Sequence, residues 1–454
     1  MTMMTRPGRS RSADLIVLAA EVALLAAAIA VGALLNHRGV RLYADAAPLY
    51  AGWRPHLGLG TPVVLLVAAL FVWRGTRWGT GLRWPRLLVG GYLASVLWTL
   101  SLALVDGWSA GLTERLTVQA EYLHEVPRVM DVGLMLSGFA DRILDFQPDS
   151  WSTHTAGHPP GALLLFVGLE RVGLGGGTAA GLACVLLGAT VSVSVPVTLR
   201  ALGAEDAARA VWPFLVLFPG AVWVGASADG IFAAVVAAGL ALLAVGGRAG
   251  AVLGGLLLGL ALYLSYGFVL VGLLAVTVVL LRARDRLGVL LLAAAAVAAV
   301  VAAFTLSGFW WLDGYHLVVR RYYQGWAAER PFGYWAWANL AALLLSAGPV
   351  AGPALRRAVA AVPIRPPGRP LAATLRQPFA TGGPAVWLPV AAAVAVLAAD
   401  VSSLSKAEVE RIWLPFAVWL LVATAHLPAS HRRWWLAAQA ATALAVNHLL
   451  WTVS

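Results

Sequence analysis

The chain contains thirteen apolar runs of about 15–22 residues, and these runs limit its fold more than any other feature. A membrane-spanning helix satisfies its backbone hydrogen bonds internally and takes roughly 20 apolar residues, whereas a strand of a membrane barrel takes about 10. The runs are too long for barrel strands. Because 60% of all residues are hydrophobic and 12% are charged, a soluble globular protein is excluded. We therefore predict an all-α, polytopic transmembrane bundle.

The predicted crossings extend over the whole chain of 454 residues. They are 13–35, 60–74, 87–105, 177–198, 209–228, 230–247, 250–265, 268–282, 287–305, 335–350, 384–400, 412–426 and 434–452. We expect residues 1–86 to form two N-terminal spans ahead of a core at 87–454. Two loops, 106–159 and 306–334, are too long for simple turns, and we expect interfacial helices in the first.

The arginines lie in short blocks between the apolar runs, which indicates how the chain is threaded. With a cytoplasmic N-terminus, 20 of the 32 basic residues lie inside, as the positive-inside rule requires, and both long loops lie outside. This threading requires that the short run 160–173 is a half-helix that does not cross. Topology thus explains the net charge of +11 without a nucleic-acid partner. We expect a multi-pass protein of a bacterial plasma membrane.

The stretch 153–161, THTAGHPPG, places two histidines and two prolines directly before an apolar run. Pro159 and Pro160 suit the first turn of a helix, whose N-terminal N–H groups and dipole attract anions such as phosphate. His158 would add a hydrogen-bond donor or a charge beside this end, with His154 one turn away. The alternative is a plain helix start with both histidines facing water.

Acidic residues provide candidates for a general base or a cation site. Glu121 and Glu125 are four residues apart, so they would share one face of an amphipathic helix, with Tyr122 and Asp131 nearby. The solvated face of an ordinary helix would show the same spacing. Asp229 stands at the head of an apolar span, where an ionisable group indicates function. Its alternative role is a helix N-cap.

Basic residues on the predicted outer side are candidate phosphate ligands. Lys406 is the only lysine of the chain, and it lies with Glu410 and Arg411 in a dense charged loop ahead of an apolar run. Arg320 and Arg321 are adjacent on the side where the topology rule disfavours positive charge. The alternatives are local ion pairs for the first group and interfacial anchors for the second.

Taken in order, these residues resemble the GT-C superfamily of membrane glycosyltransferases, in particular the branch of the protein O-mannosyltransferases and the lipid A aminoarabinose transferase. The likeness covers roughly residues 87–416 and lies in the succession Glu121-Tyr122, His158-Pro159-Pro160, a basic turn from Arg200 to Arg209, and Asp229 before an apolar helix. The resemblance implies a polyprenyl-phosphate-linked sugar at the outer face and an essential acid in the first outer loop. That acid is Glu121 or, if the matching region starts at the first span, Asp45.

The sequence therefore predicts an enzyme that transfers a sugar from a polyprenyl-phosphate donor to a glycan, lipid or protein acceptor outside the plasma membrane. Glu121 is the first candidate for the base and Asp229 the second. The candidate ligands of the donor phosphate are His158, Lys406, Arg411, Arg320 and Arg321, and the other candidate substrate contacts are Tyr122, Glu125, Asp131, His154 and Glu410. No cofactor is assigned, and a divalent cation is left open. The alternative function is a transporter or lipid-carrier flippase, for which Glu21 is the clear acid inside a span.

Overall fold

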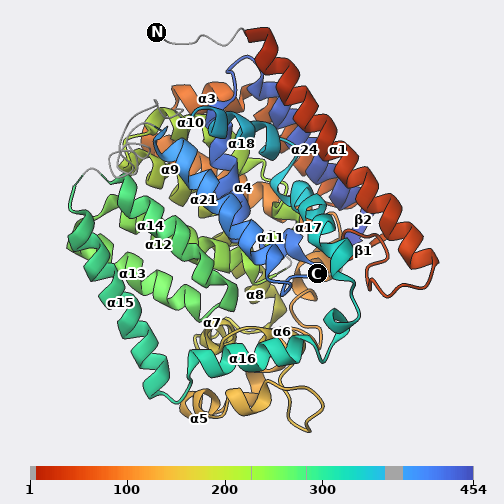
Figure 1. Ribbon diagram of the computed structural model, residues 1–454, viewed down its shortest axis with the longest axis vertical. Helices are drawn as coiled ribbons and strands as arrows, with labels where there is room; N and C mark the ends of the chain where they lie inside the picture. The colour runs from red at the N-terminus through yellow and green to blue at the C-terminus, as the bar shows by residue number, and fades with distance from the viewer. Residues whose placement is uncertain (1–6, 226, 283, 363–381, 453–454) are drawn as a thin grey trace, which may run out of the picture.

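A computed structural model describes residues 7–225, 227–282, 284–362 and 382–452. These residues form a helical molecule (Figure 1), in which the one sheet pairs two short strands, β1 (Ala51–Trp53) and β2 (Leu450–Thr452), in antiparallel register. A segment near the start of the chain thus pairs with one near its end. The prediction of an all-α chain is confirmed at this level.

One or two helices stand at each of the predicted spans. They are α1 (Pro7–His37), α2 (Thr61–Leu70) with α3 (Thr76–Gly81), α4 (Trp84–Ala103), α8 (Gly176–Gly188) with α9 (Val191–Ala201), α10 (Glu205–Val216) with α11 (Ala221–Val224), α12 (Asp229–Val245), α13 (Gly247–Leu262), α14 (Val271–Leu281), α15 (Arg286–Leu306), α17 (Phe332–Ala347), α21 (Pro384–Val401), α23 (Leu414–Leu420) and α24 (Arg432–Leu449). Within the described ranges, six helices are long and apolar enough to cross a membrane, and α17 with the bent continuation α18 (Ala351–Ala360) would make a seventh. Four further apolar helices are shorter, so the total of thirteen crossings stays a prediction.

α12 forms the centre of the bundle, because it is apolar on all sides and buried over most of its length. It packs against α8, α9, α13, α14 and α23. α1 is also apolar, but it is largely exposed and contacts α17 and α18 along one side. An exposed apolar helix surface of this length suits lipid rather than water.

The turns at the two ends of the bundle differ in kind. α3, α10 and α18, which carry arginines of the predicted cytoplasmic blocks, lie at the end where α1 begins (Figure 1). The short helices α5 (Val132–Ser137), α6 (Thr153–Gly157), α7 (Pro160–Arg171) and α16 (Trp311–Tyr322) gather at the opposite end. The two long loops therefore cover one end, and the arginine-rich turns occupy the other.

The first long loop lacks the amphipathic helix that its spacing suggested around Glu121. Residues 122–124 and 126–128 form two short 3₁₀ turns instead. Pro127 explains the break, since it has no N–H donor for a continuing helix and disfavours helical geometry in the preceding residue. The run 160–173 is α7, whose 12 residues are too few to cross a bilayer and which packs between α8 and the 3₁₀ turns. The segment between the predicted spans 335–350 and 384–400 lies largely outside the described residues.

Candidate functional site

Arg411 lies at the centre of a largely buried group of charged side chains. Its guanidinium donates to the Asp229 carboxylate at 2.9 Å and to the Glu408 carboxylate at 2.7 Å. The same guanidinium reaches Nε2 of His154 at 3.0 Å. Arg411 and Asp229 are 5% and 4% exposed, so water is excluded from their contact. Together with Glu121, which His154 contacts, these residues are called the Arg411 cluster below.

His154 connects Arg411 to Glu121. A guanidinium has only donor groups, so Nε2 of His154 must accept and the imidazole proton lies on Nδ1. Nδ1 lies 2.7 Å from Oε1 of Glu121, a close polar contact that does not meet the geometry of a hydrogen bond. Backbone pairing supports this geometry, because the N–H of His154 donates to the carbonyl of Ala120 at 2.9 Å. Two segments more than thirty residues apart are thereby held together.

The environment of Glu121 keeps its carboxylate ionised. Burial alone would raise the pKa of Glu121, but the neighbouring His154 and Arg411 outweigh burial and hold the pKa below its usual value. Glu125 does not share a helix face with Glu121, because two 3₁₀ turns replace the expected helix. Glu125 is buried separately, where it accepts from the backbone N–H of Ser152 at 2.8 Å.

Tyr122 and His158 lie beside the Arg411 cluster. The buried hydroxyl of Tyr122 is 2.8 Å from Nδ1 of His158. The same Nδ1 is 2.9 Å from the carbonyl of His154, which can only accept, so Nδ1 carries the proton. Burial lowers the pKa of His158, against the raising effect of Asp229. At neutral pH this imidazole therefore offers hydrogen bonds rather than charge.

The proline corner of the 153–161 stretch has a packing role. Pro159 and Pro160 are buried and begin α7. A Cβ at Gly161 would lie 2.5 Å from the carbonyl oxygen of Tyr263, so glycine is required for α7 to begin against the end of α13. The corner thus fixes the start of α7, and the histidines before it face the Arg411 cluster and Tyr122 rather than water.

The loop before Arg411 is strained. Ser403, Ala407 and Glu408 adopt left-handed backbone conformations, with φ angles of 61°, 75° and 61°. Such conformations cost about 1–3 kcal/mol each and persist where surrounding contacts impose them. Asn339 of α17 supplies these contacts, since its amide nitrogen donates to a loop carbonyl at 2.6 Å and its amide oxygen accepts from the N–H of Ala407 at 3.2 Å. Strain of this kind concentrates at functional sites.

Arg330 is a second buried guanidinium, and sequence reasoning missed it. Arg330 is 6% exposed, donates to the carbonyl of Lys406 at 2.8 Å and lies 3.7 Å from the Glu408 carboxylate. No pattern in the sequence distinguishes it from the other arginines of the same loop, because burial is the property that sets it apart. The Nζ of Lys406 donates to the carbonyl of Ala327 at 2.9 Å. Lys406 and Arg330 thus hold the loop 306–334 and the loop before Arg411 together.

Glu410 is fully buried next to these groups. Among the described residues, no hydrogen bond of good geometry reaches either of its carboxylate oxygens. Burial raises the pKa of Glu410 to about 7, and the charge of Glu408 adds to this effect. The backbone N–H groups of Glu410 and Tyr50 and the charge of Arg411 offset only part of this rise, so the protonated form persists up to neutrality.

Several predicted site residues lie outside the Arg411 cluster. Asp131 caps α5, where its carboxylate accepts from a backbone N–H of that helix at 2.9 Å. Arg321 pairs with Asp145 at 3.1 Å, and Arg320 is exposed. Asp45, the alternative acid of the first loop, is exposed as well. In the part of the chain that the structure describes, no group of three or more His, Cys, Asp or Glu is arranged to hold a metal ion.

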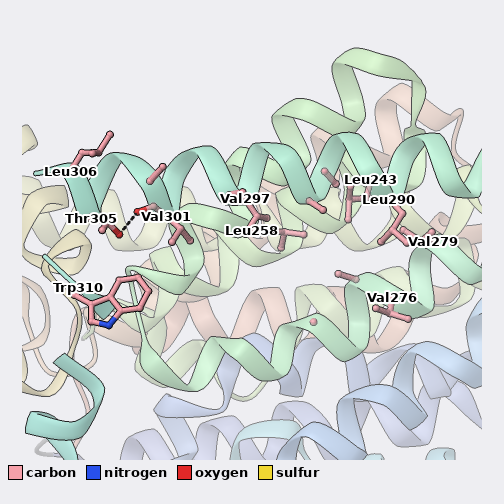
Figure 2. A pocket seen from close by; sticks show the side chains of 16 residues that line it. Leu243, Leu258, Val276, Val279, Leu290, Val297, Val301, Thr305, Leu306 and Trp310 are labelled. Atoms are coloured by element: carbon pink, nitrogen blue, oxygen red, sulfur yellow. Dashed lines mark hydrogen bonds between the residues drawn. The ribbon is translucent and has the colours of Figure 1, made fainter. Parts of the chain in front are cut away.

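An apolar groove of about 790 Å³ is bordered by α13, α14 and α15 (Figure 2). Its lining is aliphatic apart from the indole of Trp310 and from Thr305, whose hydroxyl donates to the carbonyl of Val301 at 2.8 Å. Trp310 lies at one end of the groove in Figure 2, directly before α16. α16 packs against α6, the helix that carries His154. The groove therefore ends at the start of α16, a helix that itself contacts α6.

Comparisons of the chain with protein-family models, with curated proteins and with solved structures gave no match.

Proposed function

We propose that the protein is a membrane glycosyltransferase of the GT-C type, which transfers a sugar from a polyprenyl-phosphate donor to an acceptor at the outer face of the plasma membrane. The observation that carries this proposal is the Arg411 cluster, a group of interacting ionisable side chains at the loop-covered end of a bundle of apolar helices. Buried ionisable groups with shifted pKa values are typical of catalytic sites. In this proposal the loop-covered end faces outward, the N-terminus is cytoplasmic and the chain crosses thirteen times.

The apolar groove supports a lipid-linked donor. A hydrocarbon chain gains van der Waals contacts in an aliphatic groove along a membrane helix, and it leaves no polar group unsatisfied there. A donor whose tail lies between α14 and α15 would bring its phosphate toward Trp310 and α16. The sugar would then lie at the end of the molecule where the Arg411 cluster is found.

The proposed reaction needs a base for the acceptor hydroxyl. The hydroxyl oxygen forms a bond to the anomeric carbon, and the bond between that carbon and the donor phosphate oxygen breaks. The hydroxyl proton passes to the base, and the phosphate leaves with the bonding electron pair. Glu121 is the proposed base, since its carboxylate is ionised and oriented by His154. Asp229 is the second candidate.

The departing phosphate needs positive charge and hydrogen-bond donors rather than a proton. Arg411 brings charge to the site, and its Nε has no hydrogen-bond partner among the described residues. Three carboxylates surround Arg411, so we propose that it mainly orients them. Lys406 offers further donors, and His158 would donate from Nε2 once the negative charge of a bound phosphate protonates its imidazole. Arg320 and Arg321 would contact the headgroup from the rim.

A transporter or lipid-carrier flippase is the second candidate function. Such proteins place ionisable groups within the membrane, and Glu21 of α1 is the acid that fits this description. The Glu21 carboxylate accepts from the N–H of Gly352 at 2.8 Å, so it ties α1 to the start of α18. Most of the buried charged side chains lie instead around Arg411, which favours the transferase.

The test uses purified protein in nanodiscs with a panel of polyprenyl-phosphate sugars, and it measures consumption of the donor. We expect one donor to be consumed, with the activity lost in Glu121→Gln and kept in the exposed control Glu170→Gln. If no donor is consumed but the protein moves a labelled polyprenyl phosphate across proteoliposome membranes, the flippase is correct.

A further inference from the structure

An aromatic surface lies beside Arg330. It is formed by the second long loop and by the loop that connects α1 to α2, which is called the first connecting loop below. Trp326 is 52% exposed, and Tyr43 stacks on its indole with ring centroids 4.8 Å apart and planes inclined by 5°. Tyr50 meets the same indole edge-on, with centroids 6.3 Å apart. Tyr43, Tyr50 and Trp326 are called the aromatic platform below.

The backbone of the aromatic platform is held in place by specific contacts. Tyr43 has a φ angle of 51°, a left-handed conformation that a bulky residue adopts only where contacts impose it. Arg330 supplies these contacts, because its guanidinium donates to the carbonyls of Leu42 and Tyr43 at 3.1 and 3.2 Å. Since Arg330 also lies 3.7 Å from Glu408, one buried side chain supports both the platform and the Arg411 cluster.

Charged groups border the platform. The Glu329 carboxylate accepts from the hydroxyl of Tyr43 at 2.8 Å and also pairs with Arg41, and both charged side chains are well exposed. Asp45 is exposed on the same connecting loop. Aromatic residues that anchor a protein at the membrane interface have lipid beside them, whereas these charges require water. The platform therefore faces water and suits a water-soluble ligand.

A sugar ring matches this chemistry. One face of the ring presents C–H groups, which pack on the electron-rich face of an indole, and its hydroxyls hydrogen-bond to carboxylate and guanidinium groups such as Glu329 and Arg41. A phosphate would be repelled by Glu329 and Asp45. A quaternary ammonium ion takes a cage of several aromatic faces, whereas Tyr43 covers one face of Trp326 and leaves a single platform.

We propose that the aromatic platform is the acceptor subsite and that the acceptor is a saccharide chain. One sugar unit stacks on Trp326, and the hydroxyl to be glycosylated extends past Glu408 toward the Arg411 cluster. This inference rests on the proposed glycosyltransferase function, and it narrows the acceptor to a glycan rather than a protein or lipid hydroxyl.

The test measures binding of fluorescently labelled tetrasaccharides of mannose, arabinofuranose, glucose and N-acetylglucosamine to the full chain in nanodiscs free of glycosidic detergent. We expect saturable binding of one of them at millimolar concentration or below. Trp326→Ala should weaken it by about tenfold or more, while Trp326→Phe should retain most of it. Trp434→Ala is the matched control, since Trp434 is 73% exposed in the first turn of α24, and binding should not change.

Consumption of the donor, with the sugar passing to water or to a tetrasaccharide, is measured on the same samples, so that the two proposals fail separately. Donor consumption without binding of any tetrasaccharide overturns the saccharide subsite and leaves the transferase. Binding that depends on Trp326 without donor consumption supports the subsite as a glycan site and overturns the transferase. Binding unaffected by Trp326→Ala, or displaced by tetramethylammonium, overturns the proposal.

Discussion

The guanidinium of Arg411 and the carboxylate of Asp229 form a buried ion pair at 2.9 Å, although 182 positions separate them in the chain. Asp229 lies in the first turn of the central helix α12, and Arg411 lies in the short helix α22 (Val409–Ile412). The N-cap of α12 is Ala228 and Asp229 is the first residue inside the helix, so an N-cap role does not explain Asp229. The pair instead fastens the strained loop before Arg411 to the centre of the bundle.

Replacement of Arg411 by methionine should destabilise the protein. Asp229 and Glu408 would lose their shared cation, and breaking a buried pair by removing one partner costs about 3–5 kcal/mol. The measurement is the thermal unfolding temperature in nanodiscs, followed by tryptophan fluorescence. Arg433→Met, which changes an exposed arginine of α24, should unfold near the wild-type temperature. Equal unfolding temperatures for both variants would contradict the buried pair.

Glu121→Gln should reduce the rate of sugar transfer by about 10²–10⁴-fold, the usual contribution of a positioned general base. Glutamine keeps the size of the side chain and can still accept from His154, so binding of the donor should be retained. Single-turnover rates and donor affinity are measured separately. A nearly normal Glu121→Gln enzyme together with an inactive Asp45→Asn enzyme would assign the role of general base to Asp45 instead of Glu121.

His158→Ala should weaken use of the donor by about tenfold, which corresponds to one hydrogen bond of roughly 1.4 kcal/mol. Tyr122→Phe is the matched control, because it removes the same contact between the two side chains but keeps the imidazole. We expect the KM for the donor to rise in His158→Ala and to change little in Tyr122→Phe. Full activity of His158→Ala would show that the histidine-proline corner only begins a helix and does not bind the donor.

Glu410 should make the protein less stable as the pH rises. Its pKa is about 7 in the folded chain, against the ordinary value of 4.5 that it takes when the chain unfolds, so the folded state holds the proton more tightly. Stability is therefore complete below about pH 4.5 and is lost as the pH passes 7, by about 3 kcal/mol at pH 8. Glu410→Gln should flatten the unfolding temperature between pH 5 and 8. The exposed control Glu170→Gln should keep the wild-type decline, and a decline that survives in Glu410→Gln contradicts the assignment.

The threading predicts which end of the bundle faces the cytoplasm. In a background that lacks Cys184, cysteines are introduced at Pro148 in the first long loop and at Ala361 after α18, which are both exposed. A membrane-impermeant maleimide should label Pro148→Cys in intact cells and Ala361→Cys only after the cells are opened. The opposite labelling would place the Arg411 cluster on the cytoplasmic side and exclude an outer-face enzyme.

Spacing along the chain predicted helices more reliably than it predicted contacts between side chains. The run 87–105 corresponds to α4 and the run 287–305 to α15, because a long apolar segment forms a helix for local reasons. The prediction of a helix around Glu121 was wrong because Pro127 interrupts it. Arg330 was missed because its pattern in the sequence is that of an exposed arginine.

The sequence by itself determined that the chain is helical and suited to a membrane, since a backbone in lipid must satisfy its own hydrogen bonds within each segment. It also singled out Glu121, His154, Asp229 and Arg411, because polar groups are rare in so apolar a chain. Only the tertiary structure decided that these residues meet, and that Glu121 pairs with His154 rather than acting with Glu125. Their contacts depend on how α6, α12 and α22 pack, and the pKa shifts depend on the burial that this packing creates.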